Sequence, residues 1–245
     1  MTTRDLISGL DLYSFRTRVT PALVASAPAL ALGLSYLTLL PGGQKLWSLL
    51  ALGLTSYTAL ATRRAGLRAQ ALLFARWGGA PTTSRLRYRD NHSAGEISRR
   101  HREVERVLGG GLRLPGESQE QMDPLAADVE YDTAMKRIVG KLRDHPSARL
   151  VGAENRNYGY ARNLFGLKRY AIMCAVVVVV LCLGSSVLLS WLGDWRDAVP
   201  LTLPIVVSII ALPAWTRLRA DFVKPSADAY ADRVVDVLDD LPTAS

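Results

Sequence analysis

The sequence predicts an all-α membrane protein. We expect four transmembrane helices as two hairpins flanking a helical cytoplasmic domain, plus a C-terminal amphipathic helix. Three observations support this prediction. The apolar residues gather in four uncharged runs along the 245-residue chain. Short polar turns join these runs in pairs, and nearly all basic residues lie outside the turns.

Each run has about the length that a membrane-spanning helix needs, since ~20 apolar residues cross ~30 Å of hydrocarbon. The valine block 176–180 would favour a strand in water. In lipid an open strand leaves its amides unpaired, so a helix is predicted. The second and fourth runs have only 17 and 18 residues, which leaves open whether they cross fully. The predicted spans are residues 21–40, 46–62, 170–192 and 198–215, with Trp47, Trp191, Trp195 and Trp215 at their ends, where indole rings favour the interface.

The positions of Lys and Arg predict the orientation. The two hairpin turns contain only Lys45 and Arg196, whereas the other 28 of the 30 basic residues lie in the remaining segments. Because positive residues stay inside, both termini and the middle segment are expected in the cytoplasm. The first span is expected to be retained, because no small-residue cleavage site is evident. The localisation predicted is the bacterial inner (plasma) membrane, as a multi-pass protein.

Five segments follow from these boundaries: a cytoplasmic N-terminal segment at 1–20, hairpin 1 at 21–62, a basic helical cytoplasmic domain at 63–169, hairpin 2 at 170–215, and a cytoplasmic C-terminal helix at 216–245. The middle segment has 21 Lys and Arg against 12 Asp and Glu, whereas the tail has six acids and four bases. We expect the acidic tail to pack on the basic middle, with a solvated tail as the alternative. Since the basic residues flank apolar spans, nucleic acid is not an expected partner despite the net charge of +8.

Local signals divide the middle segment. The second run is expected to continue as a helix to Trp77, where glycines end it. A capping box at Ser93–Glu96 begins a charged helix that ends before Gly109. A flexible stretch is predicted up to Met122. The next helix begins at Asp123-Pro124, and a last segment, 149–160, leads into the third span. The apolar face predicted for the helix after Pro124 consists of Leu125, Val129, Met135, Ile138 and Leu142.

The tail repeats this pattern. Pro225-Ser226 is predicted to open a helix. One side of it carries Tyr230, Val234, Val237, Leu238 and Leu241, and another side carries Asp228, Asp232, Asp236 and Asp240.

Two stretches are candidate ligand-binding sites. The first is Trp77-Gly78-Gly79-Ala80-Pro81-Thr82-Thr83, followed by Arg85, Arg87 and Arg89. Glycines allow close backbone approach, and Thr hydroxyls and Arg forks suit a phosphate. It is not a P-loop, because the Gly-Lys-Ser/Thr ending is absent. The alternatives are a helix break followed by a basic segment on anionic lipid headgroups, or a partner surface.

The second stretch lies before the third span and contains Glu154, Asn155, Tyr158, Arg162 and Asn163. In a helix, Glu154, Tyr158 and Arg162 fall four apart on one face. This set could bind a ligand, or it could be a polar packing network in which Glu154 and Arg162 pair.

No catalytic residue, cofactor or metal site is predicted. His92, His101 and His145 are dispersed and expected to face solvent, and no metal-ligand spacing occurs. Cys174 and Cys182 lie inside the third apolar run, where they are expected to be small packing residues.

The two stretches, as WGGxPTT and ENxxYGxxRN motifs, resemble part of a bacterial multi-span membrane protein family with no assigned activity. The resemblance covers mainly residues 74–170 and implies that the two motif regions act together as a cytoplasmic unit. It transfers no catalytic residue.

The function expected from the sequence is a non-enzymatic membrane sensor, effector or scaffold. Its cytoplasmic domain would bind a nucleotide ligand or a cytoplasmic protein and couple it to the membrane helices. One version is a homo-oligomeric, defence-type effector that permeabilises the membrane. The alternative is a membrane-bound enzyme or receptor that acts on a nucleotide or lipid phosphate. Anionic headgroups of the bilayer are further expected partners.

Overall fold

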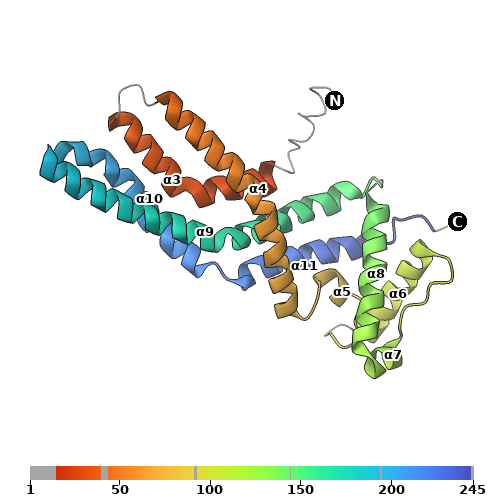
Figure 1. Cartoon of the computed structure of the whole chain (residues 1–245). Helices are drawn as coiled ribbons and strands as arrows, with labels where there is room; N and C mark the ends of the chain where they lie inside the picture. The colour runs from red at the N-terminus through yellow and green to blue at the C-terminus, as the bar shows by residue number, and fades with distance from the viewer. Residues whose placement is uncertain (1–14, 40–43, 91–92, 144, 194, 244–245) are drawn as a thin grey trace. The chain divides into compact units, whose positions relative to one another are not determined.

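The computed structural model describes residues 15–39, 44–90, 93–143, 145–193 and 195–243, and this part of the chain is helical with no strand. It divides into two compact units. Unit 1 comprises the described residues of Met1–Gln70 and Gly159–Phe222, and unit 2 those of Ala71–Tyr158 and Val223–Ser245. The elements are η1 (Phe15–Val19), α3 (Thr20–Leu39), α4 (Gln44–Trp77), α5 (Pro81–Ser84), α6 (Ala94–Leu108), α7 (Glu117–Met122), α8 (Pro124–Leu142), α9 (Ala148–Leu192), η2 (Trp195–Leu201), α10 (Thr202–Arg217) and α11 (Ala220–Asp236) (Figure 1).

Three helices are long and apolar enough to cross a membrane: Thr17–Tyr36, Ala148–Leu192 and Trp195–Arg217. They contain most or all of the first, third and fourth predicted spans. Residues 46–62, the second predicted span, belong to helix α4, but most of their side chains lie outside the described residues. The turn glycines of hairpin 1, the Trp47 side chain and Asp194 of the second turn also lie outside them. Four spans in two hairpins therefore stay a prediction.

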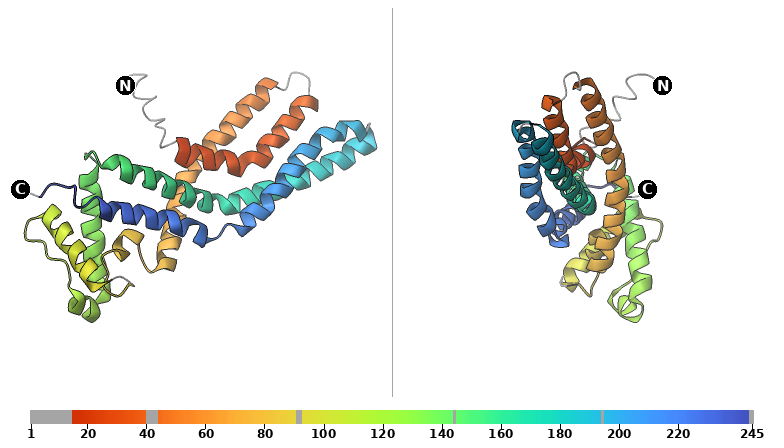
Figure 2. Two further views of the ribbon diagram at one scale, coloured as in Figure 1. Left: turned by 180° about the vertical axis from the view of Figure 1, so that it is seen from behind. Right: turned by 60° about the vertical axis from the view of Figure 1, so that its left-hand side comes forward.

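In unit 1, α3, α9 and α10 run side by side (Figures 1 and 2). Small residues such as Ala25, Ala171 and Cys182 are buried where the helices meet, which allows close packing of backbones. Ser35 Oγ donates to Pro200 O at 2.6 Å and so links α3 to η2. The outward faces of α9 and α10 carry exposed Val, Leu and Ile side chains, as expected for helices that contact lipid.

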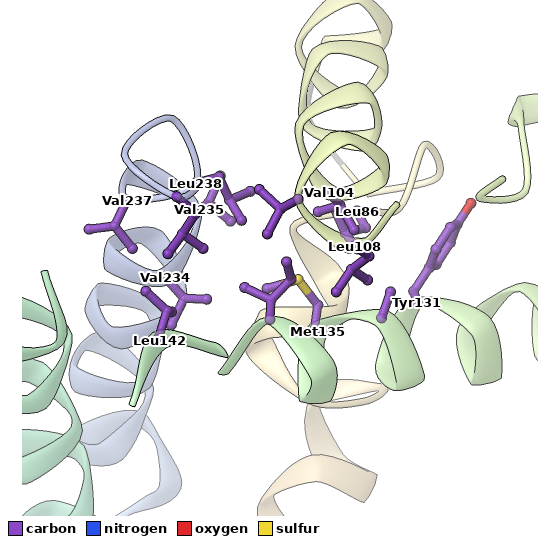
Figure 3. Packing of buried hydrophobic residues seen from close by; sticks show 14 of the residues in the cluster. Leu86, Val104, Leu108, Tyr131, Met135, Leu142, Val234, Val235, Val237 and Leu238 are labelled. Carbon is purple, nitrogen blue, oxygen red and sulfur yellow. The ribbon is translucent and has the colours of Figure 1, made fainter. Parts of the chain in front are cut away.

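The core of unit 2 is formed by α6, α8 and α11 together with the Leu86 and Leu114 segments. Figure 3 shows side chains of these three helices pointing toward one another around Met135. Among the predicted tail residues, Val234, Val237, Leu238 and Leu241 are buried here, which confirms their shared face and the packing of the tail on the middle segment.

Several predicted helix ends are confirmed. Helix α4 ends at Trp77 and α6 ends at Leu108, directly before Gly109. Ser93 Oγ accepts from Glu96 N at 3.2 Å, and Asp123 Oδ1 accepts from Ala126 N at 3.0 Å. Each bond satisfies an amide in a first helical turn that has no partner within the helix.

Three local predictions were wrong. The stretch before Met122 is not wholly flexible, because it contains α7. Leu125 and Val129 are exposed by 78% and 66%, since Ala127 and Tyr131 take their places on the core face, whereas the predicted Met135, Ile138 and Leu142 are buried. The tail helix begins at Ala220, so Pro225 lies inside it, where the burial of Val223 and Ala227 offsets one missing backbone hydrogen bond. The core face of α8 consists of Ala127, Tyr131, Ala134, Met135, Ile138 and Leu142.

Candidate functional site

The first motif forms a tight turn after α4. Gly78 and Gly79 both have positive φ, at 74° and 139°, which is a backbone region that residues with a Cβ rarely adopt. A Cβ on Gly79 would lie 2.3 Å from Nη2 of Arg87. The absence of a Cβ at Gly79 therefore leaves room for the guanidinium group of Arg87, which belongs to the same motif.

Arg87 is only 4% exposed and is fully engaged by the protein. Its Nε lies 2.7 Å from Asp128 Oδ1 and its Nη2 lies 2.9 Å from Asp128 Oδ2. Nη2 also donates to Gly78 O at 2.8 Å, and Nη1 lies 3.6 Å from Asp90 Oδ2. Such bidentate, charge-assisted bonds are strong and directional, and they link the turn to α8.

Arg85 makes the same kind of contact with α11. Its Nε lies 2.5 Å from Asp232 Oδ1 and its Nη2 lies 3.1 Å from Asp232 Oδ2, with Asp228 Oδ1 at 3.4 Å. Burial lowers the pKa of the Arg85 guanidinium, but the bonds to Asp232 and Asp228 outweigh burial and raise the pKa above its ordinary value. The arginine stays charged and holds the tail helix to the turn.

Glu120 of α7 is 1% exposed and accepts hydrogen bonds from three neighbouring residues. Its carboxylate accepts from Tyr88 N at 2.8 Å, from Arg89 Nη1 at 2.9 Å and from Tyr131 OH at 3.1 Å. Arg89 also bonds both oxygens of Asp128, at 2.7 and 2.6 Å. One network of arginines and carboxylates therefore joins the motif turn to α7 and α8.

The other residues of the first motif also lie within unit 2. The Lys224 ammonium lies 5.6 Å from the centroid of the Trp77 ring, a cation–π contact. Thr82 is half-buried. Thr83 is buried, and its Oγ1 has no hydrogen-bond partner among the residues that the structure describes.

The second motif is helical throughout and contributes to both units. Its residues in unit 2 are Glu154, Asn155 and Tyr158. Asn157 Nδ2 donates to Glu154 Oε2 at 3.4 Å, and Asn155 is half-buried. Tyr158 is buried and stacks on Tyr230, with ring centroids 6.1 Å apart. This contact fastens α9 to the tail helix.

Arg162 and Asn163 belong to unit 1, where they contact neighbouring helices. Arg162 Nη1 donates to Gln70 Oε1, and Nη2 donates to Asn163 Oδ1 at 3.5 Å. Asn163 is buried and donates to Thr17 O at 2.7 Å. The polar packing network predicted as one alternative is present for these two residues.

A close crossing of α4 and α9 lies beside this network. A Cβ on Gly166 would come within 2.6 Å of the Ala65 carbonyl oxygen and 2.9 Å of the Gly66 nitrogen. The backbones therefore approach as closely as a glycine allows. The sequence shows Gly166 but does not indicate its neighbour.

The prediction that the histidines face solvent was wrong for His101. This ring is buried, its Nε2 lies 2.7 Å from Leu86 O, and it packs between the Tyr88 and Tyr131 rings. Burial lowers its pKa below the ordinary value, although the Leu86 carbonyl raises it in part. His145 is half-buried, and His92 lies outside the described residues.

In the part of the chain that the structure describes, no group of three His, Cys, Asp or Glu side chains could hold a metal ion.

The predicted binding residues thus fall into a turn held by carboxylates, a tyrosine stack, and a polar contact at a helix crossing. Sequence reasoning missed Asp128, Glu120 and Gln70, which supply the partners, because single acidic or amide residues on charged helices carry no local signal. No family model, curated protein or solved structure matches this chain.

Proposed function

We propose that this protein is a non-enzymatic sensor, effector or scaffold of the bacterial inner membrane. In this proposal it has four spans in two hairpins, and its termini and unit 2 lie in the cytoplasm. Unit 2 receives a cytoplasmic ligand or partner protein. The main support for a non-enzymatic role is that the arginines of the first motif are already bound by carboxylates of the same chain. Asp232 binds Arg85, and Asp128 binds Arg87.

The competing function, an enzyme or receptor for a nucleotide or lipid phosphate, needs those guanidinium groups. A phosphate would have to displace a carboxylate that already makes two charge-assisted bonds to Arg87. The displaced Asp128 would then lose the bonds it accepts from both Arg87 and Arg89. This cost favours a structural role for the motif.

Two long helices support the coupling part of the proposal. Helix α4 has 34 residues and α9 has 45, and each continues without a break from a predicted span into residues of unit 2. Each helix therefore connects the unit that receives the ligand or partner in this proposal to a predicted span along the chain.

The effector version predicts that homo-oligomers form and open the membrane. Expression of the full chain should cause dye entry and loss of membrane potential, and in-cell crosslinking should give a ladder of oligomers. An intact membrane potential at high expression would contradict this version. A sensor or scaffold would then remain, and it requires a partner that crosslinks to unit 2.

The enzyme or receptor alternative has its own test. Glu154→Ala and Arg162→Ala are made separately in the full chain. If folding survives and both ligand binding and phenotype are unchanged, the alternative fails. Arg149→Ala is the matched control, because its exposed side chain lies on the same helix and outside the candidate set.

A further inference from the structure

Unit 1 contains an apolar groove that the proposed function does not use. It has a volume of about 460 Å³, within the range of small-molecule pockets. Its walls come from α3, α9 and α10, from Leu218 after α10, and from Phe222 in the first turn of α11. Its lining includes Val24, Leu164, Ala211, Trp215, Leu218 and Phe222.

The lining of this groove contains no charged side chain, and several of its residues are exposed. Ile210 is 69% exposed, Phe222 50% and Val24 43%. Its lining residues Val24, Val207 and Ile210 lie within candidate membrane spans, so we expect lipid hydrocarbon beside this part of the groove. A lipid acyl chain matches both this shape and this chemistry.

Positive charge flanks the groove where α10 ends. Arg217 and Arg219 lie on either side of Leu218 and are exposed. Neither forms an ion pair with any residue that the structure describes. Asp221 is an exposed carboxylate two residues after Arg219, so this segment carries two positive charges and one negative charge.

The segment that carries these arginines is fixed in place. Lys168 Nζ donates to Thr216 O at 3.0 Å and to Leu218 O at 2.8 Å. The ammonium thereby satisfies carbonyls at the end of α10, which a helix leaves without partners. Trp215, a buried residue near the end of α10, lines the groove beside Leu218.

We propose that this groove binds one acyl chain of an anionic phospholipid, with the phosphate held by Arg217 and Arg219. The proposal rests on insertion into the membrane, but not on sensor or effector activity. Charge complementarity favours an anionic lipid over a helix of a second copy, because a helix would need only the apolar walls. Arg forks also suit phosphate oxygens.

The test uses the full chain, reconstituted in nanodiscs of equal phosphatidylglycerol and phosphatidylcholine and then extracted in mild detergent. Native mass spectrometry counts the lipids that remain bound. We expect one retained phospholipid, with phosphatidylglycerol enriched severalfold. Equal retention of both lipids, or no retained lipid, would overturn the proposal.

Two variants separate the parts of the site. Ala214→Phe should fill the groove and remove the bound lipid, whereas Ile209→Phe on the outer side of α10 should keep it. The double variant Arg217→Gln/Arg219→Gln should retain a lipid but lose the preference for phosphatidylglycerol. Arg63→Gln/Arg64→Gln changes the same charge elsewhere and should keep the preference. A phosphatidylglycerol preference that survives in the Arg217/Arg219 variant contradicts the headgroup assignment.

Other occupants and a failure of membrane insertion give distinct results. A dimer that retains no lipid and dissociates in Ala214→Phe would place a second copy in the groove and overturn the lipid proposal. Alkaline carbonate extraction reports insertion separately. If the protein is extracted, the membrane function and the lipid site both fail. If it stays in the membrane without lipid preference, only the lipid site fails.

Discussion

The guanidinium group of Arg87 forms a two-bond fork with the carboxylate of Asp128, at 2.7 and 2.9 Å. Arg87 follows the glycine turn after α4, and Asp128 lies 41 residues later on α8. An arginine that the sequence offered as a phosphate ligand thus stabilises unit 2 instead.

Loss of Asp128 should therefore destabilise the protein strongly. Asp128→Ala leaves the buried Arg87 without its main partner, and we expect a loss of roughly 2 kcal/mol or more in the free energy of unfolding. Denaturant unfolding of the full chain in detergent, followed by circular dichroism, measures the change. Lys136→Ala removes an exposed ion pair with Asp132 on the same helix and should cost less than about 0.5 kcal/mol. Equal losses in the two variants would contradict the structural role of Arg87.

The crossing of α4 and α9 should be sensitive to a single methyl group. Gly166→Ala places its Cβ against the backbone of Ala65 and Gly66, so the helices must move apart. We expect a lower melting temperature in detergent than for the unchanged protein. Gly184→Ala, on the same helix with nothing within 4 Å, should be neutral or slightly stabilising, because alanine favours helix by up to ~1 kcal/mol. Similar melting temperatures for the two variants would show that the crossing is not tight.

His101 should make unit 2 less stable in acid. The folded protein holds this ring neutral with a lowered pKa, so Nε2–H donates to Leu86 O. The unfolded chain binds a proton near its ordinary pKa of about 6.5. Stability from this group is full above that value and is lost as the pH falls through the lower folded pKa.

His101→Gln isolates this contribution. Melting temperatures are measured from about pH 7.5 to about pH 5, the range that spans the ordinary histidine pKa. The decline below about pH 6.5 should be smaller in the variant than in the unchanged protein. Arg102→Gln is the control, since it also introduces glutamine, at an exposed position of the same helix, and removes no group that titrates in this range. Parallel curves for His101→Gln and the unchanged protein would refute the prediction.

The four-span layout predicts the side of each turn. Reporter fusions after Gly43 and Asp194 should report an external location, and fusions after Gly110 and Ser245 a cytoplasmic one. A cytoplasmic report after Gly43 would mean that residues 46–62 do not cross the membrane.

Much of the local structure followed from the sequence. The ends of α4 at Trp77, of α6 at Leu108 and the start of α8 at Pro124 depend on glycines, caps and a proline acting on their own neighbours. The apolar helices likewise depend on an unbroken run of residues, which is visible in the sequence alone.

Apart from the packing of the tail on the middle segment, contacts between distant residues did not follow from it. Leu125 and Val129 have helical spacing, yet α8 turns another face to the core because Tyr131 reaches Glu120 and the Pro115 carbonyl. Similarly, nothing local marks His101 as buried, since its partner Leu86 is 15 residues away.

By itself the sequence determined that the described residues are largely helical, where most of these helices begin and end, and that the first, third and fourth apolar runs lie in helices apolar enough for lipid, because these properties depend on neighbouring residues. Only the tertiary structure decided what the motif residues do. Arg85 and Arg87 could equally have faced a phosphate, and it is the fold that brings Asp232 and Asp128 within bonding distance of them. Charge pairing acts over a few ångströms in space and is indifferent to separation along the chain.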